Sequence, residues 1–272
     1  MARVALRPRA ENPKFRGDVV SENDATRNDA APNISVVVPV HNEAENIPVL
    51  AEEIATALKG RRFEAIFVND GSSDNTEQVL KKLGATRPWL RQIKHAQSCG
   101  QSAAVRSGAR AALAPIVVTL DGDGQNDPAF IPKLVRALEN APAKVGLVNG
   151  RRLKRKGGFK RFQSIIANGV RSFVLRDDTR DTGCGLKAFR RDVYLALPYF
   201  DALHRFTPAL VKREGFDIQY VDVVDRPRQH GQSHYGMWNR LWVGILDLYG
   251  VFWLIRRRRR VPEVTEIKSN VD

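Results

Sequence analysis

Short apolar runs alternate with segments of helical periodicity through the middle of the chain. The runs are rich in Val and Ile, as parallel strands buried on both faces tend to be. They are Ile34–Val38, Ala65–Val68, Ile116–Leu120 and Val145–Val148. Helices are predicted between them over Ile47–Leu58, from Asp74 (the start of a capping box with Glu77) to about Leu83, over Gly100–Leu113 and over Phe130–Leu138. The alternation predicts an α/β fold with a doubly wound sheet.

Three of the predicted strands lead directly into polar residues. The polar segments are Pro39–Glu43, Asn69–Asp74 and Asp121–Gln125. In open α/β sheets the ligand lies beyond the carboxyl ends of the strands. We therefore expect these three segments to meet at one edge of the sheet and to form the functional site.

The segment Asp121–Gly122–Asp123 is the sharpest chemical signal in the chain. Two carboxylates two residues apart, with a glycine that permits a tight turn, can reach one hard divalent cation, and Gln125 adds a neutral oxygen. Oxygen ligands favour Mg²⁺ or Mn²⁺, which also bind substrate phosphates. A solvated acidic turn is the alternative, but the position after an apolar strand favours metal binding.

Asp70 has two interpretations. It belongs to a strand–turn–helix connection and can serve as a cap, and its carboxylate can also bind a base or ribose over the sheet edge. The chain contains neither a P-loop pattern nor a G-x-G-x-x-G pattern after its first strand, which argues against a P-loop NTPase and a nicotinamide enzyme.

Composition narrows the class of protein. The 272 residues are 43% hydrophobic, which suits one sizeable α/β domain, and the two cysteines, Cys99 and Cys184, indicate a reducing compartment without structural zinc. The net charge of +14 favours anionic partners, and the segment 151–176 carries nine basic residues and no acidic one. Sparse aromatic residues there favour phosphate and membrane contact over nucleic acid.

The C-terminal part suggests a membrane-associated segment. The apolar run Leu241–Ile255 is followed by Arg256–Arg260, and Trp238, Trp242 and Trp253 lie in or beside it. A helix of this length is shorter than the hydrocarbon core, so an interfacial or re-entrant helix with a polybasic end is expected rather than a spanning one. A buried core helix with a basic tail is the alternative.

Seven segments, in order, resemble motifs of family 2 glycosyltransferases with the GT-A fold, in the dolichyl- or polyprenyl-phosphate mannose synthase branch. They are Val38–Glu43, Val68–Thr76, Asp121–Gln125, Asn149–Arg151, Arg161–Ser164, Asp181–Lys187 and Arg228–His234. The family patterns are V-P-x-Y-N-E, V-D-D-G-S-x-D-x-T, D-x-D-x-Q, G-S-R, R-x-x-S, D-x-x-S-G-[FL]-[RK] and R-x-x-G-x-S-K. His41, Asn69, Cys184 and His234 depart from them.

The resemblance implies roles for individual residues. Metal ligands would be Asp121, Asp123 and Gln125, and catalytic residues would be Asp123, Asp181 and Arg228. The nucleotide-sugar would contact Pro39, His41, Glu43, Val68, Asp70, Asp121, Gly122, Asp123, Arg151, Arg228 and His234. The acceptor or its phosphate would contact Arg161, Ser164 and Ser233.

The expected protein is an inverting hexosyltransferase that moves a sugar from a GDP- or UDP-linked donor to a polyprenyl phosphate, with Mg²⁺ or Mn²⁺. It would act peripherally on the cytoplasmic face of the cell membrane, in cell-envelope synthesis, with no nucleic-acid partner. A disordered tail (1–33), a GT-A domain (34–235), an interfacial helix (236–260) and a second tail (261–272) are expected. The alternatives are a transferase acting on a saccharide hydroxyl, a membrane-tethered binding protein and a nucleic-acid-binding protein.

Overall fold

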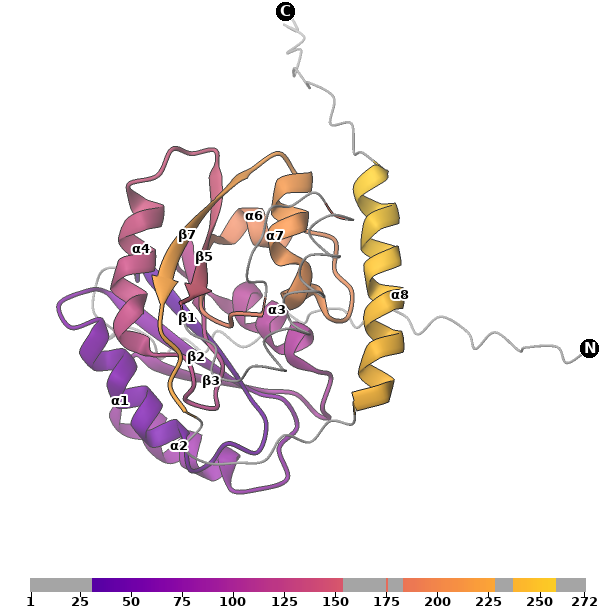
Figure 1. Ribbon diagram of the computed structural model, residues 1–272. Coiled ribbons are helices and arrows are strands. Elements are labelled where there is room, and N and C mark those ends of the chain that lie inside the picture. Colours follow the sequence, from indigo (N-terminus) through magenta and orange to yellow (C-terminus); the bar gives the residue numbers. More distant parts are fainter. Residues whose placement is uncertain (1–30, 154–174, 176–182, 228–236, 258–272) are drawn as a thin grey trace, which may run out of the picture. The chain divides into compact units, whose positions relative to one another are not determined.

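The computed structural model describes residues 31–153, 175, 183–227 and 237–257 (Figure 1). Their core is a seven-stranded mixed sheet in the order β3-β2-β1-β4-β6-β5-β7. The strands are β1 Ile34–Val40, β2 Phe63–Asn69, β3 Leu90–Lys94, β4 Ile116–Thr119, β5 Val145–Arg152, β6 Lys187–Arg190 and β7 Asp217–Val223. β6 runs antiparallel to β4 and β5, whereas the other pairings are parallel.

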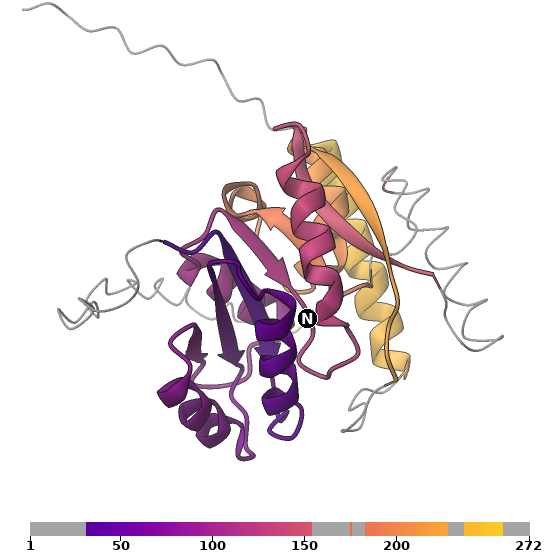
Figure 2. The same ribbon diagram turned by 90° about the vertical axis from the view of Figure 1, so that its left-hand side faces the viewer.

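Helices cover both faces of the sheet, so the doubly wound α/β prediction is confirmed. α1 (Ile47–Ala57), α2 (Thr76–Thr86) and α4 (Ile131–Glu139) share one apolar core with the sheet; α1 and α4 lie in front in Figure 2. The other core is formed by α3 (Gln101–Ala111), α6 (Arg191–Ala196) and α7 (Leu203–Arg213), with a contribution from α8 (Met237–Arg256). A short 3₁₀ turn, η1 (Pro128–Phe130), precedes α4.

The four strands predicted from apolar runs are present, and three further strands were not predicted. β3 and β7 form the two edges of the sheet, and most of their residues are only partly buried, so neither shows an unbroken apolar run. The predicted capping box at Asp74 is wrong in detail. The N-cap of α2 is Asn75, which makes no side-chain cap, and Asp74 Oδ1 instead accepts a hydrogen bond from Thr76 N at 3.0 Å.

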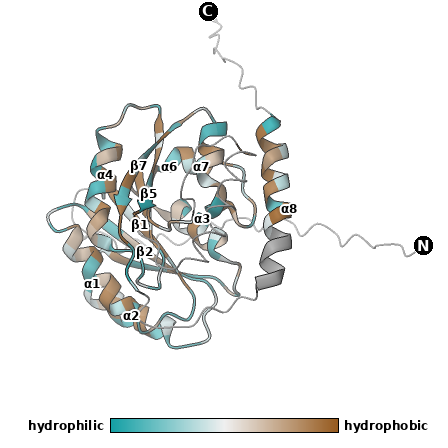
Figure 3. Ribbon diagram, viewed as in Figure 1, coloured by the Kyte–Doolittle hydropathy of each residue, from teal (hydrophilic) through white to brown (hydrophobic). Residues whose placement is uncertain are grey.

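α8 packs against α7 along part of its surface. Val251 is buried, and Arg213 Nε donates to the Leu254 carbonyl at 3.0 Å. Leu246, Tyr249 and Trp253 are exposed by 52% or more, which does not fit a helix buried on all sides, and Figure 3 shows apolar residues along this helix. Among the described residues, no helix has the length and apolar character needed to cross a membrane. The interfacial placement stays a prediction.

Candidate active site

The loops that follow β1 and β2 are joined by hydrogen bonds at the carboxyl edge of the sheet. Asn42 has a positive φ of 56°, and this conformation lets its Oδ1 accept from Ser73 N at 2.8 Å while its own N–H donates to Ser72 Oγ at 2.9 Å. His41 Nδ1 donates to the Asp70 carbonyl at 2.8 Å. The first two polar segments therefore meet, as the strand ends predicted.

Asp70 directly follows β2 and is only 4% exposed. Each carboxylate oxygen accepts two hydrogen bonds: Oδ1 from His95 Nδ1 (2.6 Å) and Cys99 N (2.9 Å), and Oδ2 from Ser98 Oγ (2.9 Å) and Gly100 N (2.8 Å). Burial by itself would raise the pKa of Asp70, but these hydrogen bonds outweigh burial and hold the pKa below its ordinary 3.8. Asp70 therefore fixes the connection between β3 and α3.

Asp70, His95 and Cys99 bring a carboxylate oxygen, a ring nitrogen and a sulfur within 4.8 Å of one another. This is the one group of three such side chains in the described part of the chain. It does not suit a metal, because the Asp70 oxygens are already saturated and His95 Nε2 lies 2.9 Å from Ser107 Oγ. We interpret the group as a structural network.

The loop after β4 places two carboxylates beside the same edge. Asp121 Oδ1 accepts from Gln101 Nε2 at 2.7 Å, and the Asp121 N–H donates to Asn126 Oδ1 at 2.9 Å. Asp123 Oδ1 accepts from Gln125 N at 3.1 Å. A Cβ at Gly122 would lie 2.9 Å from the Pro39 carbonyl, so a glycine there allows this loop to pack closely on β1. The third polar segment thus joins the other two.

Burial, then the charge of Asp123, raise the pKa of Asp121 to about 6, and Asp225 adds to this effect against the opposing Lys187 and Arg152. Such mutual repulsion between carboxylates is relieved by a divalent cation, so the donor set of Asp121 and Asp123 fits Mg²⁺ or Mn²⁺. For Gln125 the structure gives backbone contacts only, and its role as a ligand stays a prediction.

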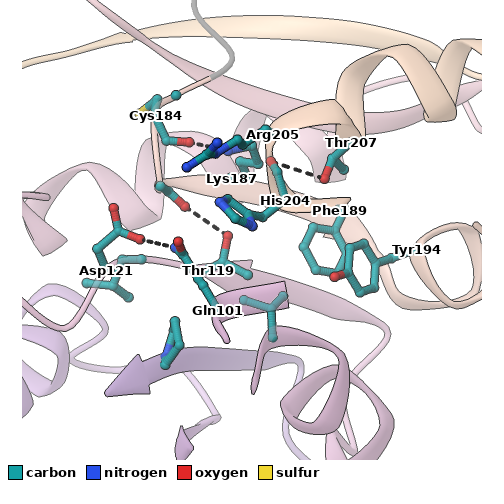
Figure 4. A pocket seen from close by; sticks show the side chains of 15 residues that line it. Gln101, Thr119, Asp121, Cys184, Lys187, Phe189, Tyr194, His204, Arg205 and Thr207 are labelled. Atoms are coloured by element: carbon teal, nitrogen blue, oxygen red, sulfur yellow. Dashed lines mark hydrogen bonds between the residues drawn. The ribbon is translucent and has the colours of Figure 1, made fainter. Parts of the chain in front are cut away.

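Beside Asp121 opens a pocket of about 230 Å³ (Figure 4). Its lining includes Val105 and the stacked rings of Phe189 and Tyr194, whose centroids are 4.3 Å apart. Nitrogen-bearing side chains also line it; they are Gln101, Lys187, His204 and Arg205. The motif comparison included Lys187 without giving it a role. Sequence reasoning missed Gln101, His204 and Arg205, because they lie in helices far along the chain from the Asp121 segment.

The exit of β7 is tied to the loop that carries Asp121 and Asp123. Asn126 and Asp225 form an isolated β-bridge, and Arg226 N donates to the Gln125 carbonyl at 2.8 Å. The Arg226 guanidinium bonds Glu53 Oε1 at 2.7 Å and Asp127 Oδ1 at 2.6 Å. These contacts of Asp225 and Arg226 fix the position of the chain where it leaves β7.

Other predicted site residues have different surroundings. Glu43 Oε2 accepts from Asn46 Nδ2 at 2.5 Å, and Val68 is buried in the core. Arg151 Nε donates to Asp222 Oδ1 at 2.6 Å, a pairing that the sequence did not reveal. The remaining predicted residues lie outside the described ranges; they are Arg161, Ser164, Asp181, Arg228, Ser233 and His234.

Residues 35–197 match the family described as Glycosyl transferase family 2, which is more than half of the chain. The chain belongs to glycosyl transferase family 2. Membership confirms the family predicted from the seven motifs. The match ends just after α6, so it includes the segments that carry Asp70 and Asp121 but not His204 or Arg205.

Two curated relatives of this chain have names that contain a polyprenyl phosphate. Dodecaprenyl-phosphate galacturonate synthase from Rhizobium johnstonii is 34% identical over 234 residues, which cover 84% of this chain and 68% of the relative. Undecaprenyl-phosphate 4-deoxy-4-formamido-L-arabinose transferase from Edwardsiella ictaluri is 31% identical over 208 residues, covering 75% and 63%. The chain thus spans about two thirds of the length of these relatives.

The fold is shared with glucosyl-3-phosphoglycerate synthase from Mycobacterium tuberculosis. Its crystal structure in complex with Mn²⁺, uridine diphosphate and glucosyl-3-phosphoglycerate superposes with a TM-score of 0.62 at 22% identity, covering 82% of this chain and 80% of that one. A second crystal structure, with Mg²⁺ and uridine diphosphate, gives a TM-score of 0.63 at 21% identity. At this identity the likeness shows the fold alone.

Proposed function

We propose that this family 2 glycosyltransferase moves a sugar, with inversion, from a GDP- or UDP-linked donor to a polyprenyl phosphate. The pair of Asp121 and Asp123, held beside the β1 and β2 loops in a family 2 fold, carries the proposal. The names of two relatives, which both contain a polyprenyl phosphate, support the choice of acceptor. Their sugars differ, so family membership leaves the sugar open.

The donor diphosphate would lie at the carboxyl edge of the sheet. Asp121 and Asp123, with Gln125, would hold Mg²⁺ or Mn²⁺ there, and the crystal structures of the fold neighbour with these ions support this assignment. The bound cation would neutralise charge on the leaving diphosphate. Gln101 orients Asp121 from the start of α3, and the Asp70 network fixes that start.

The nucleotide would lie over the first half of the edge, beside Pro39, His41 and Glu43. His41 is exposed, and the hydrogen bond to the Asp70 carbonyl orients its ring, so the ring is available to the base of the nucleotide. The Asp70 side chain supports the loop through its own hydrogen bonds. We propose that Asp70 contributes through this support, because four protein donors already occupy its oxygens.

The acceptor phosphate oxygen would attack the anomeric carbon opposite the diphosphate. A phosphate is ionised at neutral pH, so its attack requires no strong general base. Arg161, Ser164, Ser233, Arg228 and His234 are proposed to contact phosphates, and Asp181 to orient the acceptor or, for a hydroxyl acceptor, to act as a base. Arg151, which is paired with Asp222, is proposed to contact the donor.

A lipid acceptor requires contact with a membrane, and α8 supplies an apolar exposed surface for it. Leu246, Tyr249 and Trp253 are exposed, and the Arg256 guanidinium lies 4.2 Å from the Phe252 ring centroid. Aromatic and cationic residues together favour the interface of an anionic bilayer. We propose peripheral attachment through 236–260 at the cytoplasmic face, in the synthesis of cell-envelope glycolipids.

A donor screen tests the proposal. The full chain is incubated with Mn²⁺ or Mg²⁺, a short-chain polyprenyl phosphate and a panel of GDP- and UDP-sugars, and glycolipid is detected by mass. A glycolipid that disappears with EDTA is expected. Hydrolysis of a nucleotide-sugar without glycolipid would keep the transferase site and reject the polyprenyl phosphate, and transfer to a saccharide instead would replace the acceptor.

A further inference from the structure

The pocket beside Asp121 is rich in nitrogen-bearing hydrogen-bond donors, two of which are cationic. Lys187, at the start of β6, is 6% exposed, and His204 and Arg205 follow each other at the start of α7. Figure 4 shows the three side chains grouped on one side of the pocket, with Asp121 to their left. A buried ammonium is costly unless it meets an anion or strong acceptors.

His204 is held as a neutral donor. Ser102 Oγ accepts from the His204 backbone N–H at 3.2 Å and lies 2.8 Å from His204 Nδ1. Because Ser102 Oγ already accepts this N–H, we assign the hydrogen of the buried Ser102 hydroxyl to Nδ1, which places the proton of the neutral ring on Nε2. Burial, then the charges of Lys187 and Arg205, lower the pKa of His204 to about 3, so the ring stays neutral at pH 7.

Three oxygens in the wall of the pocket that carries Lys187, His204 and Arg205 already accept a hydrogen bond. The Cys184 carbonyl accepts from Lys187 Nζ, the Gly185 carbonyl accepts from Thr119 Oγ1 at 2.9 Å, and Asp121 Oδ1 accepts from Gln101. A sugar hydroxyl needs an acceptor as well as a donor, whereas a carboxylate only accepts. The wall is therefore better matched to an ionised oxyanion than to a neutral hydroxyl.

The position of Lys187, His204 and Arg205 beside Asp121 indicates which group of the substrate they would contact. Under the proposed function, on which this inference rests, the donor diphosphate would be held at Asp121 and Asp123, and the attached sugar would extend into the pocket that Asp121 lines. The stacked Phe189 and Tyr194 rings offer an apolar surface to the sugar ring. The donors of Lys187, His204 and Arg205 then face a substituent of that ring.

We propose that this pocket recognises a carboxylate on the transferred sugar, so that the donor is a nucleotide-linked hexuronic acid. Lys187 and Arg205 supply charge, and His204 supplies a neutral donor through Nε2. Recognition adds no step to the transfer, since the carboxylate is bound and remains unchanged.

The test compares matched donors in binding and in transfer. Full-length protein with Mn²⁺ is titrated calorimetrically with UDP- and GDP-linked hexuronates and with the corresponding neutral hexoses. Since hydrogen bonds to charged groups are the strong ones, the hexuronate is expected to bind about tenfold more tightly than the hexose. Arg205→Gln and Lys187→Gln should reduce this ratio, Arg205→Lys should largely keep it, and Arg205→Gln should leave the affinity for the bare nucleotide unchanged.

Substitution of Lys187 is more disruptive to folding than substitution of Arg205, because Lys187 is buried and Arg205 is exposed. Arg205→Gln therefore tests the proposal even if Lys187→Gln does not fold. Equal binding of hexuronate and hexose by the wild type, with transfer of the hexose to polyprenyl phosphate, would overturn the carboxylate site and leave the proposed function intact. Preferential binding of the hexuronate without formation of a glycolipid would support the carboxylate site and overturn the proposed function.

A third outcome assigns the pocket to the acceptor. If Arg205→Gln raises the KM for polyprenyl phosphate and leaves the donor ratio unchanged, the oxyanion bound there is the acceptor phosphate and the carboxylate proposal is wrong. The reverse pattern, a lost donor ratio with an unchanged acceptor KM, supports it.

Discussion

Asp70 and Asp121 follow the two strands that flank β1, yet their surroundings are opposite. Asp70 accepts four hydrogen bonds from protein donors, and its pKa is lowered. For Asp121 one side-chain hydrogen bond is seen, from Gln101; burial and the charge of Asp123 raise its pKa to about 6. One carboxylate is satisfied by the protein itself, and the other lies in an environment that favours a cation.

This difference separates two kinds of acidic residue that sequence motifs present alike. A carboxylate saturated by the protein builds the site, because losing it disturbs the loops around it. A carboxylate left in an unfavourable environment serves a ligand, because the ligand relieves the repulsion. Substitutions at the two positions should therefore change different properties, activity at the Asp121 loop and stability at Asp70.

The largest expected effect is on activity, at Asp123. Asp123→Asn keeps the shape of the side chain but removes a charged metal ligand, so turnover should fall by about a thousandfold or more while the fold is retained. Steady-state transfer rates and circular dichroism measure the two properties. Asp192→Asn, in α6, is the matched control and should keep normal activity. Full activity in Asp123→Asn would remove the metal site from the proposed function.

Stability should respond most at Asp70. In Asp70→Asn an amide NH₂ faces donors that formerly met a carboxylate oxygen, and the part-buried N–H of Cys99 or Gly100 loses its acceptor. The free energy of unfolding should fall by about 2–4 kcal/mol, measured by urea denaturation. Glu52→Gln, which removes a surface ion pair with Arg87, should change it by less than about 1 kcal/mol.

Two results would contradict this account of Asp70. Unchanged stability in Asp70→Asn would mean that the network contributes nothing to folding. Loss of nucleotide binding at unchanged stability would instead make Asp70 a direct ligand, as the family resemblance implied.

The contrast also marks how far the sequence could predict the molecule. Ile34–Val38 and Ile116–Leu120 were identifiable as strands because both faces are buried, and the polar residues after them located the site edge. β3 and β7 were not identifiable, because edge strands lack a continuous apolar run.

Within the site, the sequence identified the acidic residues but not their partners. The donors to Asp70 come from His95–Gly100, at least 25 positions away, and no local pattern links them to the carboxylate. His204 and Arg205 are brought to the pocket by α7, after the antiparallel strand β6 that was not predicted. Which carboxylate is saturated depends on such distant contacts, and therefore required the structure.

A smaller effect is expected at Gly185, which lies against Asp121. A Cβ there would be 2.3 Å from Asp121 Oδ2, so Gly185→Ala must displace the carboxylate. Affinity for Mn²⁺ in the presence of nucleoside diphosphate should fall about tenfold or more, since groups that orient a metal ligand typically contribute that much. Gly84→Ala, in which the nearest atom to the new Cβ would be 3.7 Å away, is the control and should leave the affinity unchanged. Equal affinities for Mn²⁺ in the two variants would show that Asp121 is not a metal ligand.

The smallest expected effect is on the pH dependence of stability, to which His204 and Asp121 of the same pocket contribute with opposite sign. The pKa of His204 falls from 6.5 to about 3 on folding, so the unfolded chain binds more protons in that range, and the stability due to neutral His204 is lost as pH falls from 6.5 towards 3. Asp121 has the opposite sign, because its pKa rises from 3.8 to about 6 and protonation below pH 6 favours the folded state. Without metal the two slopes oppose each other between pH 3.8 and 6.

His204→Gln removes the first slope and leaves the second. Urea denaturation in EDTA from about pH 6.5 to about pH 4 should therefore show the variant gaining stability relative to wild type as pH falls, by at most about 1.4 kcal/mol per pH unit. A constant offset between wild type and variant over this range would show that His204 is protonated normally in the folded protein. In that case the ring would carry charge at mildly acidic pH, and the Ser102 hydrogen bond would not fix it as the neutral donor that the carboxylate site requires.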